Sequence, residues 1–243
     1  MKFSDEGIII FAKKHGENSL IIKILSKENG VCTAFVRKST SPKNYSKYQI
    51  GNLVFFDLYA KNSDSLSYVR VENLASFASR HILSFTRLNI ITLFCLIISK
   101  NFMDQDPNKD LFSSFILFLQ SLGQDDKVIL ANIIKFELKL LEISGYGLDL
   151  SSCAVTGKKD DLYFISPKSG RVASYESGKP YEDKLFLLTK FFKNNLILSK
   201  DISGDDLMES VNITIFFMKK YDLLSGGLID LSKKINKSLL EGL

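Results

Sequence analysis

Five short segments rich in β-branched and aromatic residues occupy the first 78 residues of the chain, and turn-forming residues separate them. They are Gly7–Ala12, Ser19–Ser26, Val31–Arg37, Leu53–Ala60 and Leu66–Phe77. Asn29-Gly30, between the second and third segments, favours a tight hairpin because both residues tolerate positive φ angles. Five strands in so short a stretch predict a small closed barrel, such as the five-stranded kind that often binds oligonucleotides. An SH3-like barrel or an open sheet fits the same pattern.

Helical periodicity replaces the strand pattern after residue 80. The expected helices are Arg80–Met103, Lys109–Leu122, Asp125–Ser144, Glu182–Leu198 and Asp205–Leu224. A turn-rich stretch at about residues 151–180 interrupts them, and two β-like pieces in it, Leu162–Ser166 and Gly170–Tyr175, indicate a small hairpin. The sequence therefore predicts an α+β protein, with a β domain over residues 1–78 and an all-helical domain with a hairpin insert over residues 79–243.

Residues that build metal centres and nucleophilic active sites are scarce in this chain. Its three cysteines, Cys32, Cys95 and Cys153, are too few and too widely spaced for a disulfide framework or a cysteine zinc site. Only two histidines, His15 and His81, are present, and no motif marks either as part of a catalytic triad. We therefore expect no catalytic residues, no metal, no cofactor and no enzymatic activity.

The chain also lacks the patterns that direct a protein to a membrane. Acidic residues come early, at Asp5 and Glu6, and no signal-peptide pattern is present. The longest apolar run, Leu88–Ser99, is shorter than the ~20 residues that a helix needs to cross a bilayer, so it is predicted to be a buried core helix. These features predict a cytoplasmic protein that does not act on membranes.

Positive charge is concentrated in one loop of the predicted barrel. The net charge of the chain is +5, and no acidic residue lies between Asn29 and Phe56. Four basic residues cluster in that stretch, at Arg37, Lys38, Lys43 and Lys47. A basic segment without acidic residues is expected where a polyanion binds. The alternative is a solvated loop in a lysine-rich protein.

Two tyrosines, Tyr45 and Tyr48, alternate with these cations. Basic side chains bind phosphates and release counterions, and a tyrosine ring can stack on an unpaired base. Because such contacts carry little sequence preference, the loop is predicted to bind DNA without reading its sequence. Lys13 and Lys14, in the first loop between strands, extend the same surface in this interpretation. Alternatively, the tyrosines belong to the core at the end of a strand.

Several short motifs follow one another in a fixed order along the chain. The most specific are Phe136-Glu137-Leu138-Lys139-Leu140-Leu141, Gly145-Tyr146-Gly147-Leu148-Asp149-Leu150, Cys153 and Phe164-Ile165-Ser166-Pro167. Others in the first domain are Asp5-Glu6-Gly7-Ile8-Ile9-Ile10, Gly16-Glu17-Asn18-Ser19-Leu20-Ile21-Ile22 and Gln49-Ile50-Gly51-Asn52-Leu53. Taken together, over most of its length, the chain resembles the RecO family of bacterial DNA repair and recombination mediators.

The resemblance implies an N-terminal OB-fold barrel and a helical C-terminal domain. It implies binding of single- and double-stranded DNA, annealing of complementary strands, and help for a RecA-type recombinase in replacing single-strand-binding protein. The implied partners are RecR and the acidic C-terminal tail of the single-strand-binding protein. Lys135 and Lys139, one helical turn apart, are candidates for a site that takes such a tail, and the alternative is that both face solvent. If the barrel is only structural, the chain is instead a protein–protein adaptor without DNA contact.

Some members of the family carry a four-cysteine zinc site in the insert. Here Cys153 stands at one such position, Thr156 occupies the next, and Arg171–Glu176 contains no cysteine. We therefore predict an insert without zinc, held together by packing alone.

Overall fold

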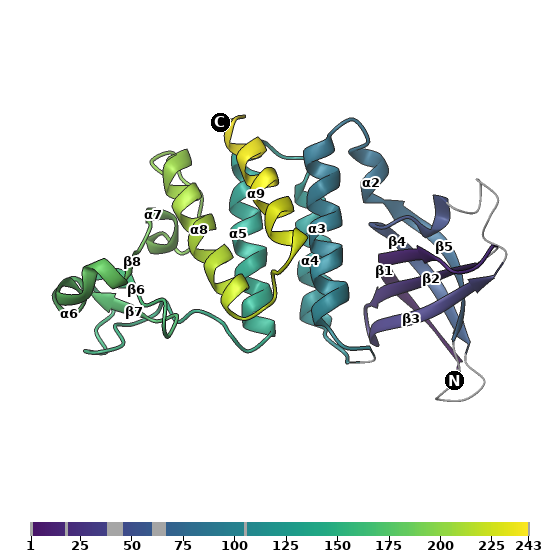
Figure 1. Ribbon diagram of the computed structural model, residues 1–243, viewed down its shortest axis with the longest axis horizontal. Helices are drawn as coiled ribbons and strands as arrows, with labels where there is room; N and C mark the ends of the chain where they lie inside the picture. Colours follow the sequence, from purple (N-terminus) through teal and green to yellow (C-terminus); the bar gives the residue numbers. More distant parts are fainter. Residues whose placement is uncertain (1, 18, 38–45, 60–66, 105, 243) are drawn as a thin grey trace. The chain divides into compact units, whose positions relative to one another are not determined.

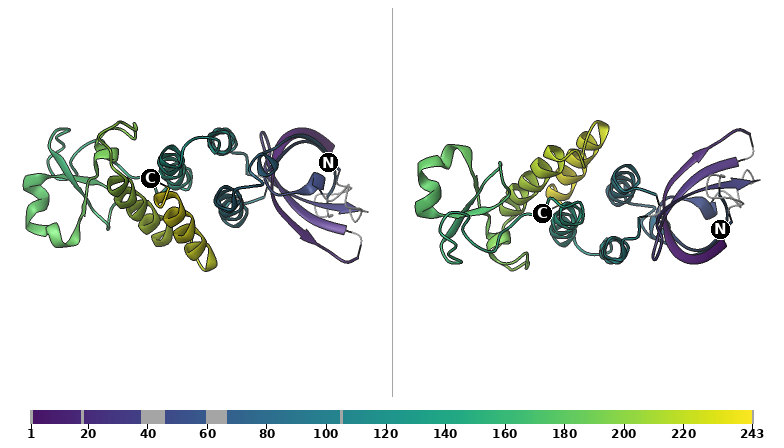
Figure 2. Two further views of the ribbon diagram at one scale, coloured as in Figure 1. Left: turned by 90° about the horizontal axis from the view of Figure 1, so that it is seen from above. Right: turned by 90° about the horizontal axis from the view of Figure 1, so that it is seen from below.

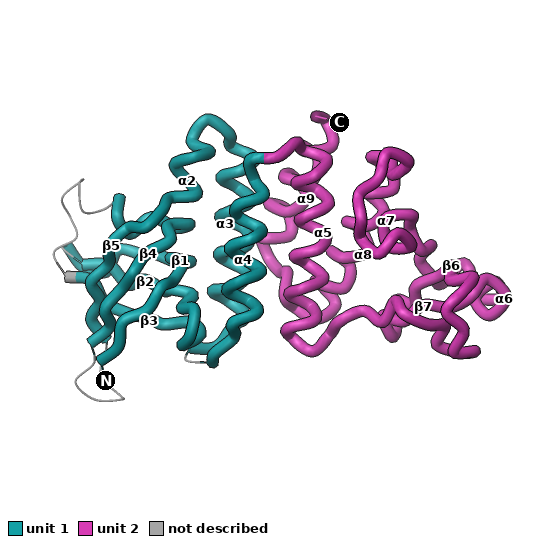
Figure 3. The backbone as a smooth tube through the Cα atoms, turned by 180° about the vertical axis from the view of Figure 1, so that it is seen from behind, with its two compact units in different colours: residues 1–123 teal, residues 124–243 magenta. Residues whose placement is uncertain are grey.

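The computed structural model describes residues 2–17, 19–37, 46–59, 67–104 and 106–242 of the 243-residue chain (Figure 1). The chain divides into two compact units, residues 1–123 and 124–243, which are coloured separately in Figure 3. The first unit contains a closed five-stranded barrel and the second contains helices with a small three-stranded sheet. The predicted α+β class is confirmed.

The five predicted strands form a closed barrel whose curvature is visible in Figure 2. The strands are β1 (Lys2–Lys14), β2 (Ser19–Ser26), β3 (Gly30–Arg37), β4 (Asn52–Tyr59) and β5 (Tyr68–Ser76). Their order is β1-β2-β3-β5-β4, and all neighbours are antiparallel except β3 and β5, which are parallel. This closed five-stranded order is that of an OB-fold and excludes an open sheet.

Apolar side chains on alternate positions of each strand fill the inside of the barrel. Phe56 and Ile9 are fully buried there, and Phe3 contacts the ring of Phe56 edge-on at 5.9 Å between ring centroids. The other buried members of this core are Leu20, Ile22, Ile24, Cys32, Ala34, Val36, Val54, Leu58 and Val69. Because side chains alternate between the two faces of a strand, the residues between these positions face outward.

The predicted Asn29-Gly30 turn lies between β2 and β3 and needs its glycine. Gly30 has a φ angle of +69°, and a Cβ atom added to it would lie 2.1 Å from the backbone oxygen of Asp106. Any other residue would therefore be strained in its backbone and would also collide with the segment that precedes the helix at Lys109–Ser121.

In the described part of the first unit, three α-helices follow the barrel: α2 (Phe77–Arg80), α3 (Phe85–Asn101) and α4 (Lys109–Ser121). The predicted helix Arg80–Met103 begins later, because Ser84 caps a new helix by accepting the N–H of Arg87. Helix α3 packs against β1, and Lys23 Nζ donates to the carbonyl of Ser99 near its end at 3.1 Å. The compact unit therefore extends beyond the predicted first domain.

In the second unit, helix α5 (Asp126–Ile143) packs against α8 (Gly204–Lys220) and α9 (Gly227–Leu240). Thr214 on α8 donates a hydrogen bond to the carboxyl group of Glu137, which is buried on α5. Most other buried residues of α5 are apolar, among them Ile129, Ile133, Ile134, Phe136, Leu140 and Leu141.

The predicted hairpin of the insert is confirmed by the antiparallel pairing of its two strands, and a third strand extends it to a sheet in the order β7-β6-β8. Its strands are β6 (Leu162–Ile165), β7 (Val172–Ser174) and β8 (Phe186–Leu187), and the short helices beside it are α6 (Tyr175–Gly178), η2 (Lys179–Lys184) and α7 (Lys190–Lys193). The predicted helix Glu182–Leu198 is therefore wrong. Thr189 caps α7 by accepting the N–H of Phe192, and positive φ angles at Asn195 and Leu196 follow the end of this short helix.

Among the described residues, no helix combines the length and the apolar composition that crossing a membrane requires.

Candidate nucleic-acid interface

Only three of the predicted DNA-binding residues of the basic loop, Arg37, Lys47 and Tyr48, belong to the described part of the chain. Lys38, Lys43 and Tyr45 lie outside the described residues. Arg37 is the last residue of β3, and Lys47 is exposed on the single turn η1 (Ser46–Tyr48).

Tyr48 packs against the barrel core and is only partly exposed. Burial raises the pKa of its phenol above the ordinary value. The neighbouring backbone is fixed by Asn52, whose buried side-chain amide donates to the carbonyls of Ser46 at 3.0 Å and Lys47 at 3.1 Å. Much of the Tyr48 ring therefore packs at the edge of the core, as in the alternative interpretation. Stacking of this ring on a base stays a prediction.

Lys13 and Lys14 lie at the end of β1 and are exposed. The strand register places Lys13 opposite Ile21 of β2, and Ile21 opposite Phe35 of β3. Neighbouring strands are ~4.8 Å apart, so Lys13 and Phe35 are separated by roughly 10 Å on one face of the sheet. In the described part of the chain, no carboxylate forms an ion pair with Lys13, Lys14 or Lys47.

An aromatic groove that the sequence did not predict lies on the same face of the sheet as Lys13, across β2 from it. It is about 470 Å³ in volume and is lined by Phe35, Tyr59, Tyr68, Val69 and Arg70. The Phe35 ring contacts Tyr68 edge-on at 5.8 Å and His15 edge-on at 5.7 Å between centroids. Tyr68 pairs with Phe35 on one side and with Tyr59 on the other, which brings three strands together at this point.

Cations flank the aromatic groove. Lys2 Nζ lies 5.3 Å from the centroid of the Tyr59 ring, within the range of a cation–π contact. Arg70 lines the groove and is exposed, and Lys13 lies across β2 from Phe35. Ring faces next to exposed cations can stack bases while the cations contact the phosphates between them.

The candidate peptide-binding lysines lie on α5 in the second unit. Lys135 is exposed, whereas Lys139 is partly buried and its Nζ lies 3.2 Å from the Glu142 carboxylate. The positive charge of Lys139 is therefore partly balanced, and Lys135 is the more accessible of the two. Binding of an acidic tail at these residues stays a prediction.

The sulfur of Cys153 is the centre of a hydrogen-bond cluster in the insert. It accepts the N–H groups of Ser174 at 3.3 Å and Thr156 at 3.5 Å, and the hydroxyls of Ser174 and Ser177 lie 3.7 and 4.0 Å from it. Burial raises the pKa of this thiol, but the donors of Thr156, Ser174 and Val155 outweigh burial and lower the pKa to about 5. These hydrogen bonds add to the apolar packing of Cys153 with Phe164 and Ala173 in the insert.

This cluster does not fit a zinc ion. Structural zinc sites use cysteine and histidine ligands, whereas three of the four side chains here are hydroxyls. Across the residues that the structure describes, no group of three His, Cys, Asp or Glu side chains could hold a metal ion.

Comparison with known proteins gives consistent matches to both parts of the chain. Residues 1–77 match the family model "Recombination protein O N terminal" and residues 83–221 match "Recombination protein O C terminal". A DNA repair protein RecO of Rickettsia canadensis is 35% identical over 221 residues, which cover 91% of this chain and 89% of the relative. The protein of the same name from a Wolbachia of Drosophila simulans is 35% identical over 227 residues, covering 91% and 92% of the two chains. The Bartonella quintana protein of that name is 30% identical over 237 residues, covering 97% and 96%.

Proposed function

The chain belongs to the RecO family of DNA repair proteins, and we propose from this premise that its barrel binds single-stranded DNA along the aromatic groove. Membership gives the protein a role in DNA repair and recombination. In the proposal, the protein binds single- and double-stranded DNA, anneals complementary strands, and helps a RecA-type recombinase load onto strands coated by single-strand-binding protein. It does so in the cytoplasm and without enzymatic turnover.

The aromatic groove is the observation that supports this function best. Phe35, Tyr59 and Tyr68 come from three strands and line one depression with Arg70. Each base that stacks on such a ring contributes ~1–3 kcal/mol with little sequence preference. Single strands expose their base faces, so the groove suits unpaired DNA.

Basic residues of the barrel domain supply the attraction for phosphates in this proposal. Arg37, Lys38, Lys43 and Lys47 of the basic loop, together with Lys13 and Lys14, are the proposed phosphate contacts. A surface that neutralises two DNA backbones lowers the repulsion between them, while contacts to phosphates leave the base edges free to pair. Annealing then follows from binding alone.

The proposed protein partners contact the second unit. An acidic tail of single-strand-binding protein would meet Lys135, which is exposed on α5, with Lys139 one turn away. This contact and one with RecR would connect bound DNA to the single-strand-binding protein that coats it and to the recombinase that replaces this protein.

The test is a titration of the full chain with a fluorescent single-stranded oligonucleotide at several salt concentrations. The quadruple variant Arg37→Ala, Lys38→Ala, Lys43→Ala and Lys47→Ala should bind more weakly. Its plot of log K against log salt should be flatter by ~0.7 for each lost phosphate contact. Unchanged affinity and slope in this variant would remove the basic loop from the interface.

A second candidate function is that of an adaptor without DNA contact, which the accessible Lys135 favours. A peptide that ends in acidic residues and one apolar residue would then bind the chain, whereas the oligonucleotide would not bind at any salt concentration. Weaker peptide binding by Lys135→Ala, with Lys127→Ala on the same helix as the control, would assign the site.

A further inference from the structure

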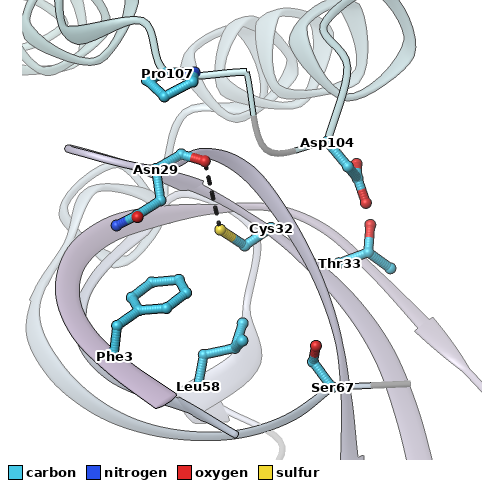
Figure 4. Close-up of a pocket in the computed structure, with 8 residues that line it drawn as sticks. All are labelled: Phe3, Asn29, Cys32, Thr33, Leu58, Ser67, Asp104 and Pro107. Carbon is cyan, nitrogen blue, oxygen red and sulfur yellow. Dashed lines mark hydrogen bonds between the residues drawn. The ribbon is translucent and has the colours of Figure 1, made fainter. Parts of the chain in front are cut away.

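A small pocket lies on the barrel near the start of β3 (Figure 4). It has a volume of about 180 Å³, is partly open to solvent, and combines apolar and polar side chains. Its lining is Phe3, Asn29, Cys32, Thr33, Leu58, Ser67, Asp104 and Pro107.

Thr33 presents an unsatisfied hydroxyl to this pocket. Its Oγ1 atom is buried and has no hydrogen-bond partner among the described residues. Leaving a polar atom buried without a partner costs ~1–3 kcal/mol, so native structures rarely do so without a reason. In Figure 4 the Asp104 carboxylate points toward this hydroxyl, and no hydrogen bond joins the two. Because the Asp104 side chain is 44% exposed, it can move aside, and a ligand atom can then reach and satisfy the Thr33 hydroxyl.

The remainder of the pocket is apolar. Phe3 and Leu58 lie on the side opposite Asp104 and Thr33 (Figure 4). Cys32 lies between these two sides (Figure 4). Burial raises the pKa of its thiol to about 12, and the negative charges of Asp104 and Asp5 act in the same direction. The thiol is therefore neutral. One apolar side and one polar edge are the two features that a flat heteroaromatic ring requires. A cavity of ~150 Å³ in another protein already binds benzene, so the space is adequate for one ring system whose far edge faces solvent.

The position of the pocket connects it to the aromatic groove. Thr33 precedes Phe35 by two residues on β3, so the two side chains share one face of the strand and lie ~6.6 Å apart along it. Ser67 directly precedes Tyr68, and its carbonyl accepts the N–H of Phe35 at 2.7 Å. Thr33 thus lies on the outer face that carries the groove, whereas Cys32 and Leu58 belong to the inside of the barrel. A base next to one stacked on Phe35 or Tyr68 can therefore reach the polar edge of the pocket and direct its ring toward the apolar side.

The acceptor chemistry of the polar edge discriminates among bases. A carboxylate accepts two parallel donors best, and guanine offers N1–H and the 2-amino group side by side. The Thr33 hydroxyl can then donate to O6 of the same base. Thymine has one N–H between two carbonyl acceptors, which a carboxylate repels. Lys23 Nζ lies 4.0 Å from the Asp104 carboxylate and partly balances its charge against the approaching DNA.

We propose that this pocket binds one unpaired guanine base of a single strand, held by Asp104 and Thr33, while the remaining bases are bound without preference. The inference rests on the proposed function, because it requires that the barrel bind single-stranded DNA.

The experiment measures competition by unlabelled oligonucleotides for the full chain. A thymine homopolymer is compared with the same strand carrying one central guanine, hypoxanthine, cytosine or adenine. A correct pair of hydrogen bonds to a base edge discriminates by ~5- to 100-fold, so the guanine strand should compete at least fivefold better than the homopolymer. Hypoxanthine lacks the 2-amino group and should lose most of that advantage.

Two variants assign the preference to the pocket. Thr33→Val removes the hydroxyl at nearly constant shape, and Asp104→Asn replaces one acceptor oxygen by a donor. Each should bring the guanine-to-thymine ratio close to one and leave binding of the thymine homopolymer within about twofold. Glu72→Gln, which neutralises an exposed carboxylate on β5 of the same barrel, is the control and should keep the ratio.

The outcomes separate this inference from the proposed function. Equal competition by all strands, or a guanine preference that persists in Thr33→Val and Asp104→Asn, overturns the pocket and leaves DNA binding by the barrel intact. No binding of any strand overturns the proposed function itself. A guanine preference lost in both variants and kept in Glu72→Gln supports the inference.

Discussion

Thr214 on α8 donates a hydrogen bond to the carboxyl group of Glu137 on α5, 77 residues away in the sequence, and both side chains are buried. Burial raises the pKa of Glu137 to about 8, while the hydrogen bond from Thr214 acts in the opposite direction. The carboxyl group is therefore mainly protonated at neutral pH, and the helix pair contains a neutral acid rather than a charge.

This raised pKa predicts how stability depends on pH. The unfolded chain releases the Glu137 proton near pH 4.5, whereas the folded chain keeps it until about pH 8. The folded state thus binds more protons in this window, so the free energy of unfolding should fall as pH rises from about 4.5 to 8. Below and above that window the contribution of Glu137 should be constant. The total change is roughly 5 kcal/mol at most.

Urea unfolding of the wild type and of Glu137→Gln at several pH values measures this contribution as the difference between the two curves. A difference that does not change between pH 5 and 8 would show that Glu137 does not titrate in this window.

Substitution of the turn glycine should destabilise the barrel strongly. Gly30→Ala forces alanine to a φ angle of +69° and drives its Cβ into the backbone of Asp106. We expect a loss of roughly 2–4 kcal/mol in the free energy of unfolding. Gly16→Ala is the matched control, because Gly16 has a φ angle of +66° but no atom within 4 Å of an added Cβ, so it should lose only about 1 kcal/mol. Similar losses in both variants would contradict the role assigned to Asp106.

The aromatic groove should contribute affinity without changing the dependence on salt. Phe35→Ala removes a ring that can stack on a base and should weaken binding of single-stranded DNA by ~1–3 kcal/mol, with the salt slope unchanged. Phe55→Ala is the control, since Phe55 is 39% exposed on β4 of the same barrel and does not line the groove. Fluorescence anisotropy at three salt concentrations, after thermal melting has shown that both variants fold, checks the expectation. Equal losses in the two variants would rule out a special role of the groove.

The cluster around Cys153 should become a zinc site when its hydroxyls are replaced. Two of them, on Ser174 and Ser177, lie 3.7 and 4.0 Å from the Cys153 sulfur, a spacing close to that between ligands of one tetrahedral ion. We expect the variant Thr156→Cys, Ser174→Cys and Ser177→Cys to bind one zinc ion, measured by metal analysis after dialysis. Cobalt should give the absorption of a tetrahedral thiolate site, and the Cys153→Ala version of this variant should bind far more weakly. No bound metal in the triple variant would mean that the four cysteine sulfurs do not come close enough together to bind one ion.

Strands and long helices were accessible from sequence because their patterns are local. Alternation and turn residues predicted all five barrel strands, and the apolar face of α5 was predicted from its spacing. The region after Glu182 was mispredicted because its apolar residues, among them the buried Phe191 and Phe192, recur in the sequence at helical spacing. In the structure these residues belong to several short elements rather than to one helix. What ends helix α7 is the backbone of Asn195 and Leu196, whose positive φ angles leave little signal in the sequence.

The aromatic groove was missed for a different reason. Phe35 stands between Ala34 and Val36 in an almost wholly apolar strand, so its outward direction shows only in its alternation with the buried Cys32, Ala34 and Val36. Its partner Tyr68 is 33 positions further along the chain, and their contact depends on the register of β3 with β5. Charge, by contrast, is visible in any sequence, so the basic loop could be predicted.

The closure of the barrel has a consequence for whatever occupies the groove. In the described part of the chain, β3 and β5 are paired only at Phe35 and Tyr68, whereas the other neighbouring strands are paired at seven or eight positions each. A ligand that contacts both aromatic side chains bridges β3 and β5, the neighbouring strands with the fewest paired residues in the described part of the barrel. Binding of the ligand would then stabilise the barrel, and a barrel without ligand would lose its β3–β5 pairing first.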